Sequence, residues 1–159
     1  TQPYRLVDTD IKKVVRTMVV LYDEPAVVVI DRLSKYKNTS TFTTRFFGYN
    51  TDGKVDQEVL PDGFMIRRPH AVIRAMTYAS VGSTIRKGSL DIAPEVAKTH
   101  PYLEVQTAPT KEALMVTVFS IGRKESDTVR AEISTSPEAL KVAIGSVRLH
   151  ITDDGCTLL

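Results

Sequence analysis

Cysteine and tryptophan are the scarcest residues in this sequence of 159 amino acids. Cys156 is the single cysteine, and there is no tryptophan. One cysteine forms no disulfide within the chain and supplies no cysteine-based zinc site. The cysteine content therefore excludes a disulfide-stapled scaffold and leaves the cellular compartment open.

Long apolar runs and a strong charge of one sign are missing as well. No run reaches the length of a membrane-spanning helix, so we expect no membrane segment. The net charge of +2 is far from that of a basic nucleic-acid-binding tail, so we expect no nucleic-acid partner. The chain begins at Thr1, with neither a methionine nor the charged start and apolar core of a signal peptide. These features predict a fragment of a larger protein.

What remains is the composition of one globular domain. Hydrophobic residues make up 42% of the chain and charged residues 25%, which are ordinary values for a folded domain. A chain of this length buries a sizeable core. We therefore treat residues 1–159 as a single domain.

The strongest structural signal is the stretch of residues 14–33, VVRTMVVLYDEPAVVVIDRL. Branched and apolar residues fill both of its arms, as in packed strands, and a turn at Asp23-Glu24-Pro25 separates them. A two-stranded hairpin is only marginally stable in water. The rest of the chain must therefore cover this hairpin with further strands.

Short apolar or alternating segments, separated by turn residues, recur along the remaining sequence. This pattern is typical of an all-β sandwich of two antiparallel sheets, with at most a helical turn at residues 93–99. The further strands are predicted at residues 4–7, 39–49, 55–59, 64–67, 70–79, 84–92, 102–107, 113–121, 129–133, 139–144 and 147–151.

The motifs that usually carry chemistry do not occur. The eight glycines stand singly rather than in a phosphate-binding loop, and no G-x-S-x-G elbow is present. His70, His100 and His150 lack the spacing of a metal motif. We therefore predict no metal, no cofactor and no catalytic residue in this chain.

Arginine is the most suggestive feature for binding. Arg67, Arg68 and His70 stand together around Pro69, and Arg74 lies on the same stretch. A guanidinium group recognises a carboxylate by a planar two-point contact, so these residues are candidates for holding an acidic sugar. The alternative is that they are solvated charges at the start of a strand.

A second candidate is His100-Pro101-Tyr102, where an imidazole and a phenol flank a proline that restricts the backbone. The alternative is a loop that enters a strand, with Tyr102 at its edge. Asp31 ends an apolar run and precedes Arg32, and a carboxylate there could be functional. We expect it instead to cap a loop or pair with a neighbouring arginine, because a carboxylate beside a core needs a partner. A sugar-stacking face is a further possibility for four aromatic residues, the alternative being core packing: Tyr22, Tyr36, Phe47 and Tyr49.

Taken in order, these segments resemble the β-domain of the heparinase II/III-like proteins. Arg16-Thr17 and Asp31-Arg32, each flanked by apolar residues, resemble the hairpin of that family, including its proline-containing turn. Two later pieces also fit: FMIRRP at residues 64–69, and HPYLEV at 100–105 followed by LMVTV at 114–118. The resemblance runs from about residue 14 to residue 121 and extends to residue 151.

This resemblance implies the C-terminal β-sandwich domain of a polysaccharide lyase whose other domain is an α/α toroid. Family members cleave uronic-acid polymers such as glycosaminoglycans and alginate by β-elimination. In that reaction one group neutralises the carboxylate, a tyrosine or histidine removes the C5 proton, and an acid protonates the leaving oxygen. The general base and the general acid must lie within hydrogen-bond reach of the protons that they transfer.

The chain departs from the family pattern in three places. The toroid is absent, no H-x-H-x-D segment precedes Val14, and Phe46-Phe47-Gly48 stands where some members place a histidine. The resemblance therefore carries over no catalytic residue, and we expect the isolated chain to be inactive. It further implies a periplasmic or secreted bacterial protein that meets an acidic polysaccharide and packs against the toroid. The alternative is a non-catalytic module for carbohydrate binding or domain assembly.

Overall fold

The computed structural model of the protein describes residues 9–90, 100–136 and 139–159. Within these residues the regular structure consists of β-strands and a 3-10 helix, η2. Their bounds are β1 Ile11–Leu21, β2 Ala26–Lys35, β3 Thr43–Phe47, β4 Asp56–Leu60, β5 Gly63–Arg68, β6 Ala71–Ala79, β7 Ser83–Leu90, β8 His100–Thr107, β9 Glu112–Gly122, η2 Glu125–Asp127, β10 Glu132–Thr135, β11 Leu140–Ile144, β12 Val147–Ile151 and β13 Cys156–Leu158.

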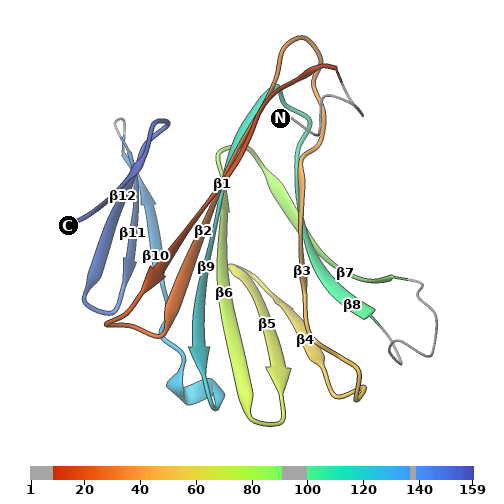
Figure 1. The fold of residues 1–159 in the computed structure, drawn as a ribbon, viewed down its shortest axis with the longest axis vertical. Helices are drawn as coiled ribbons and strands as arrows, with labels where there is room; N and C mark the ends of the chain where they lie inside the picture. The colour runs from red at the N-terminus through yellow and green to blue at the C-terminus, as the bar shows by residue number, and fades with distance from the viewer. Residues whose placement is uncertain (1–8, 91–99, 137–138) are drawn as a thin grey trace.

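The strands form three antiparallel sheets that stack as layers. The middle sheet has six strands in the order β1-β2-β9-β6-β5-β4, and all of its neighbouring strands are antiparallel. A four-stranded sheet, β10-β11-β12-β13, covers one side of it, and a three-stranded sheet, β3-β8-β7, covers the other. Figure 1 shows these layers from left to right, with the four-stranded sheet on the left.

Alternation along β9 explains why both faces of the middle sheet are covered. Successive side chains of a strand point to opposite faces, and in β9 nearly every residue is apolar. Val116 and Val118 pack in the cluster with the four-stranded sheet, whereas Ala113 and Met115 pack in the cluster with the three-stranded sheet. A strand that is buried on both faces reads as the near-continuous apolar run seen here.

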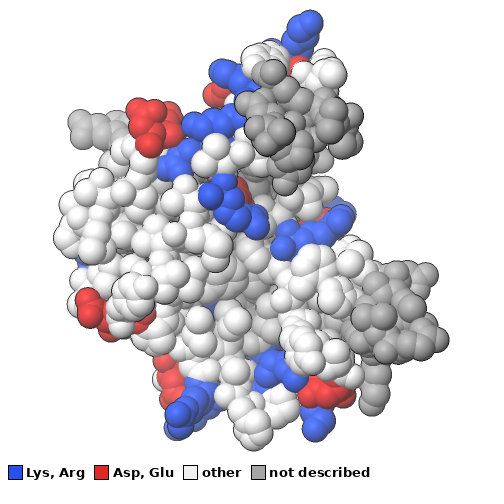
Figure 2. Space-filling view, viewed as in Figure 1, with Lys and Arg blue, Asp and Glu red and all other residues white. Residues whose placement is uncertain are grey.

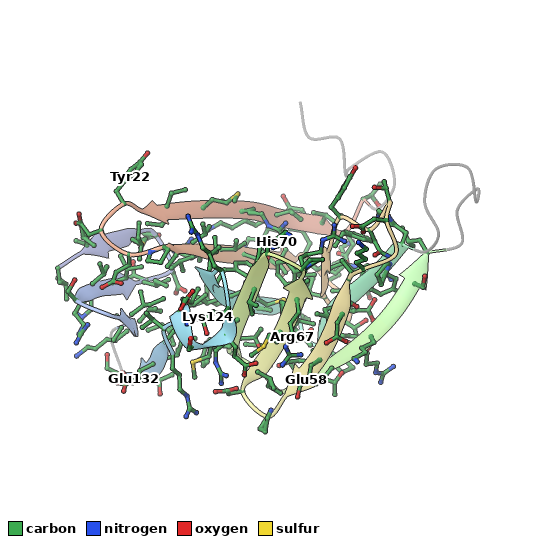
Figure 3. All side chains as sticks on the ribbon, turned by 90° about the horizontal axis from the view of Figure 1, so that it is seen from below. Tyr22, Glu58, Arg67, His70, Lys124 and Glu132 are labelled. Carbon is green, nitrogen blue, oxygen red and sulfur yellow. The ribbon has the colours of Figure 1, made fainter. Side chains whose placement is uncertain are left out.

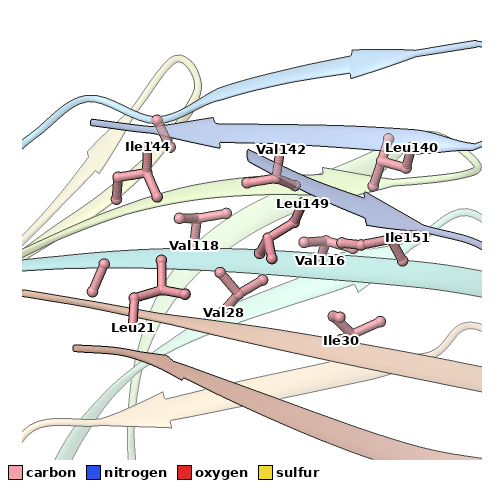
Figure 4. Close-up of a cluster of buried hydrophobic side chains, with 12 residues drawn as sticks. Leu21, Val28, Ile30, Val116, Val118, Leu140, Val142, Ile144, Leu149 and Ile151 are labelled. Atoms are coloured by element: carbon pink, nitrogen blue, oxygen red, sulfur yellow. The ribbon is translucent and has the colours of Figure 1, made fainter. Parts of the chain in front are cut away.

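The larger core lies between the middle sheet and the four-stranded sheet. Val28 and Ile30 from β2 meet Val142 and Leu149 from the opposite layer, and all four are at most 1% exposed (Figure 4). Full burial of side chains of this size contributes about 1.5–3 kcal/mol each relative to exposure. The C-terminal four-stranded sheet is therefore an integral part of the fold.

The second core lies between the middle sheet and the three-stranded sheet. Phe64 and Leu103, both 0% exposed, pack there with Phe46 and Phe119. The rings of Phe46 and Phe119 meet edge to face, with their centroids 5.1 Å apart. Strands β4 and β7 are the edges of their sheets and contact one another, so the two sheets close at this side and leave a groove at the other.

The predicted all-β antiparallel sandwich is confirmed, but it consists of three sheets rather than the two that were expected. Several boundaries differ from prediction. The strand expected at residues 39–49 is limited to β3, Thr43–Phe47. The strand expected at residues 129–133 begins later, at Glu132, because the Val129 amide donates to the Ser120 hydroxyl at 2.7 Å instead of joining a ladder. Strand β13 was not expected from the sequence. The strand predicted at residues 4–7 and the helical turn at 93–99 lie outside the described residues.

Candidate functional site

Arg67 lies at the end of β5 and is surrounded by carboxylates. Its guanidinium donates to Glu58 at 2.6 Å, to Asp56 at 3.2 Å and to Glu125 at 3.3 Å. The hydrogen bond to Glu58, with smaller effects of Glu125 and Asp56, raises the pKa of Arg67 above its usual value. Figure 3 shows Arg67 beside Glu58 on the neighbouring strand. The charge of Arg67 is thus already balanced within the protein.

Arg68 has a comparable partner. Its guanidinium donates to both oxygens of the Asp52 carboxylate and lies 5.9 Å from the centre of the Tyr49 ring. The hydrogen bond from Arg68 lowers the pKa of Asp52 to about 2. Beside this pair, His70 lines a shallow hollow of about 380 Å³ with Lys54. Arg68 and His70 therefore share one surface, on which Asp52 already holds the guanidinium.

Arg74 stands apart from the other arginines. It pairs with Met65 in the β5–β6 ladder, and its guanidinium lies 3.5 Å from an oxygen of Asp62. Arg130 contacts the other oxygen of the same carboxylate at 3.0 Å. Arg74 thus takes part in an ion-pair cluster at the β4–β5 turn. A substrate-binding role for the three arginines and for His70 stays a prediction.

The structure brings His100 and Tyr102 together on the outer face of the three-stranded sheet. Phe47 lies beside both: its ring centroid is 5.1 Å from that of His100 and 5.6 Å from that of Tyr102. The guanidinium of Arg45 lies 5.0 Å from the Tyr102 ring centroid and donates to Glu104 at 2.7 Å. Two of the residues singled out in the sequence thus join an aromatic and cationic surface.

The other aromatic residues considered for sugar stacking lie elsewhere. Tyr22 is at the tip of the β1–β2 hairpin, is 96% exposed, and projects away from the body of the molecule in Figure 3. Tyr49 contacts Arg68. Sequence reasoning did not find Arg45 and Arg86 as members of the outer face. Arg45 is two residues from Phe47, and Arg86 is two residues from Gly88, so each pair shares a strand face. This spacing indicates a common surface only when β3, β7 and β8 are known to be neighbours.

A groove of about 340 Å³ opens between the middle sheet and the edge strand β3. Its floor comes from the middle sheet, and Phe46 and Phe47 form its wall. Met18, at 62% exposure, and Ile121, at 40%, lie at its rim. Figure 2 looks into this hollow, which is white at its centre and has Lys and Arg side chains around it. The residues that line it are Met18, Val27, Val29, Arg45, Phe46, Phe47, Ile66, Ile73, Phe119 and Ile121.

The described residues contain neither a metal-binding cluster nor a membrane-spanning helix. No group of three His, Cys, Asp or Glu side chains there is arranged to hold a metal ion. No helix among those same residues is long and apolar enough to cross a membrane. The candidate surfaces are therefore the outer face around Phe47 and the apolar groove.

The fold resembles that of a solved structure. The fold is similar to that of the crystal structure of heparinase III, with a TM-score of 0.60 and 14% sequence identity. The alignment covers 95% of this chain and 24% of the heparinase III chain. This chain therefore has the fold of one part of heparinase III. No protein-family model matches the sequence, and no curated protein matches it either.

The resemblance seen in the sequence is thereby confirmed at the level of the fold. At this identity the likeness does not transfer an activity or a substrate. The chain spans about a quarter of heparinase III. The match therefore does not establish for this chain the activity of a whole enzyme of that kind.

Proposed function

We propose that this chain is the C-terminal β-sandwich module of a heparinase II/III-like polysaccharide lyase. The intact protein would cleave uronic-acid polymers by β-elimination, and this module would itself be non-catalytic. The observation that carries the proposal is the likeness to heparinase III over 95% of this chain and only 24% of the other. Such coverage fits one module of a larger enzyme.

The arrangement of the polar groups supports a non-catalytic role. β-Elimination needs a base, an acid and a carboxylate-neutralising group that converge on one sugar. Arg67 and Arg68 are engaged with carboxylates. His70 lies in the turn between β5 and β6 of the middle sheet, whereas His100 lies on β8 of the three-stranded sheet. His100 and Tyr102 lie on the outer face of a sheet rather than in a cleft that would exclude water.

The apolar groove supports packing against a second domain, which the family resemblance expects to be an α/α toroid. Exposed apolar residues continue from the groove along the same face of β1, where Val20 is 53% exposed and Val14 is 42% exposed. A contiguous exposed apolar patch often marks an interaction surface. The parent would be a periplasmic or secreted protein whose partner is an acidic polysaccharide such as a glycosaminoglycan.

The experiment that tests the reaction uses ultraviolet absorbance of the unsaturated uronate product. This chain and the full-length parent are incubated separately with heparan sulfate, hyaluronan, chondroitin and alginate. We expect product from the parent with at least one polymer, and none from this chain. Turnover by this chain would overturn the non-catalytic role, and a parent inactive on every polymer would overturn the lyase assignment.

Packing against the second domain has its own test. The chain is mixed with the remainder of the parent, and complex formation is followed by size-exclusion chromatography. Met18→Glu places a charge at the rim of the groove and should abolish the complex. Leu158→Glu is the matched control, since Leu158 is 64% exposed on the four-stranded sheet. Equal behaviour of the two variants would remove the groove from the interface.

The second candidate function is a carbohydrate-binding or domain-assembly module without any link to a lyase. The aromatic and cationic outer face favours it. Binding of glycans by this chain, combined with a parent that lacks lyase activity, would support this alternative.

A further inference from the structure

We propose that the outer face of the three-stranded sheet binds a chain of acidic sugars. Phe47, His100 and Tyr102 supply the stacking surface, and Arg86 supplies the group that holds a carboxylate or sulfate. These four residues are called the aromatic platform below. The inference rests on the proposed function for its choice of polymer, but the site itself is argued from the geometry.

Strand register places the platform residues in neighbouring rows on one face. Phe47 pairs with Tyr102, which pairs in turn with Gly88 on the other side. Arg86 precedes Gly88 by two residues, and side chains two apart share a face of the sheet. Leu103, next to Tyr102, is 0% exposed in the core. The platform therefore faces away from the middle sheet.

Gly88 makes room for the Tyr102 ring. A Cβ atom on residue 88 would lie 2.3 Å from Cζ of Tyr102 and 2.5 Å from its hydroxyl oxygen. The ring therefore lies directly above the backbone of β7, in space that any other residue at position 88 would fill. This placement extends the aromatic surface from β3 across β8 to β7.

The rings on the platform form a continuous surface. Phe47 is 46% exposed, and its ring is inclined by only 31° to that of His100. A pyranose ring presents C–H groups on its faces, which pack well on aromatic side chains, while its hydroxyl groups need polar partners. The imidazole of His100 and the phenol of Tyr102 combine apolar bodies with polar tips. Such a surface suits a sugar better than a purely apolar peptide segment.

The charges on this face select for an acidic sugar. Arg45 is committed to Glu104 by the hydrogen bond of 2.7 Å. Arg86 faces Glu104 from the other side in the ladder, is exposed, and makes no ion pair within the part of the chain that the structure describes. Among the residues that the structure describes, one positive charge beside the rings is therefore uncompensated. Its planar guanidinium is suited to two-point contact with a carboxylate or a sulfate.

The platform and the apolar groove differ in chemistry, so they suit different partners. The groove is lined almost wholly by aliphatic and aromatic side chains and offers few polar groups to sugar hydroxyls. The platform combines rings with a hydroxyl, an imidazole and a guanidinium. Phe47 borders both surfaces, because it also lines the groove. A protein partner in the groove would leave His100, Tyr102 and Arg86 free for glycan.

Calorimetric titration of this chain tests the inference. The probes are octasaccharides from heparan sulfate and from alginate, a neutral cello-oligosaccharide, and a single-stranded DNA of similar length. We expect at least one acidic octasaccharide to bind at least about ten-fold more tightly than the other two probes, a difference of about 1.4 kcal/mol. Absence of binding to both acidic octasaccharides, or equally tight binding of the neutral oligosaccharide or the DNA, overturns the proposal.

Variants locate the site. Phe47→Ala and Arg86→Gln should each weaken binding about ten-fold, that is by about 1.4 kcal/mol. Tyr22→Ala is the control for an exposed aromatic residue, and Arg123→Gln is the control for an exposed arginine. Both controls should bind as the unaltered chain does. If the controls lose as much affinity as the platform variants, the platform is not the site.

A further variant guards against a misfolded protein. Phe47→Ala also removes ring contacts, so its far-ultraviolet circular dichroism is compared with that of the unaltered chain. Gly88→Ala displaces the Tyr102 ring without removing any aromatic residue, and it should also weaken binding. Wild-type affinity in both Gly88→Ala and Arg86→Gln overturns the proposal. Met18→Glu, in the groove, should leave glycan binding unchanged. A wrong assignment of the groove to domain packing can therefore be told apart from a wrong assignment of the platform to glycan binding.

Discussion

Asp31 and Arg32 are neighbours on β2 whose side chains leave opposite faces of the middle sheet and fasten a different outer layer on each side. The Asp31 carboxylate accepts hydrogen bonds from Arg16 across the β1–β2 ladder and from Thr44 on β3. The Arg32 guanidinium donates to the carbonyl groups of Thr152 and Gly155, which flank the β12–β13 turn. This dipeptide, part of the family-like hairpin pattern, thus has a structural role.

Replacing Asp31 with asparagine should destabilise the protein. The carboxylate is 8% exposed. It accepts two hydrogen bonds from the Arg16 guanidinium, at 2.6 and 2.8 Å, and one from the Thr44 hydroxyl, at 3.1 Å. Hydrogen bonds to a charged group contribute about 1.5–3 kcal/mol, so Asp31→Asn should lower the free energy of unfolding by about 2 kcal/mol, measured by urea denaturation. The exposed Asp23→Asn is the control. A loss below 0.5 kcal/mol, about the size of a neutral surface change, would contradict this account.

Replacing Arg32 with methionine should loosen the C-terminal hairpin. The guanidinium is the donor for the Thr152 carbonyl at 2.6 Å and the Gly155 carbonyl at 2.7 Å. Without it, the β12–β13 turn loses its link to the middle sheet, and local opening becomes easier. We expect faster hydrogen exchange at the amides of β13 in Arg32→Met and unchanged exchange in the exposed Arg123→Met. Unchanged exchange in both variants would show that the turn is held by other contacts.

Gly63 should not tolerate a side chain. A Cβ atom there would lie 1.9 Å from the carbonyl oxygen of Ala75, which belongs to the neighbouring strand backbone. Backbone cannot move aside cheaply, so Gly63→Ala should cost about 2 kcal/mol or more. Gly82→Ala is the matched control, because nothing lies within 4 Å of a Cβ atom at that position. Thermal unfolding of the two variants gives the comparison, and equal melting temperatures would refute the prediction.

The Arg68–Asp52 pair predicts a pH dependence. Asp52 has its pKa lowered from 3.8 to about 2, mainly by the hydrogen bond from Arg68. A carboxyl group whose pKa is lower in the folded state adds stability above its unfolded pKa. This contribution is complete above pH 3.8 and disappears as the pH falls through about 2.

The measurement is an NMR titration of the Asp52 side-chain carboxyl carbon. In Arg68→Gln the pKa of Asp52 should rise toward its ordinary value. Asp10 is an internal control, because the pKa of its carboxyl group is lowered mainly by the backbone amide of Asn38, which Arg68→Gln leaves in place. A pKa of Asp52 that stays near 2 in the variant would exclude Arg68 as the cause.

The amino-acid sequence by itself determined the local features of this protein. The runs in β2 and β9 contain so many branched and apolar residues that they favour buried strands in any context. Asp62-Gly63 and Asn50 through Gly53 mark turns for reasons of backbone geometry, and Gly53 indeed has a φ of 69°. The expected pairing of Asp31 with an arginine is also confirmed, but the partner is Arg16 across the β1–β2 ladder and not the adjacent Arg32.

Only the tertiary structure decided which distant segments meet. Phe47 and Tyr102 became neighbours through the β3–β8 ladder, and Gly88 joined them through β7. The same packing pairs Arg67 with Asp56, Glu58 and Glu125, and Arg68 with Asp52. The positions of the two arginines in the sequence did not indicate these partners. The physical reason is that the alternation of side chains along a strand fixes which residues share a face of that strand. Strand order and register depend instead on packing between distant segments, and a register slip of one residue would move every side chain of a strand to the opposite face.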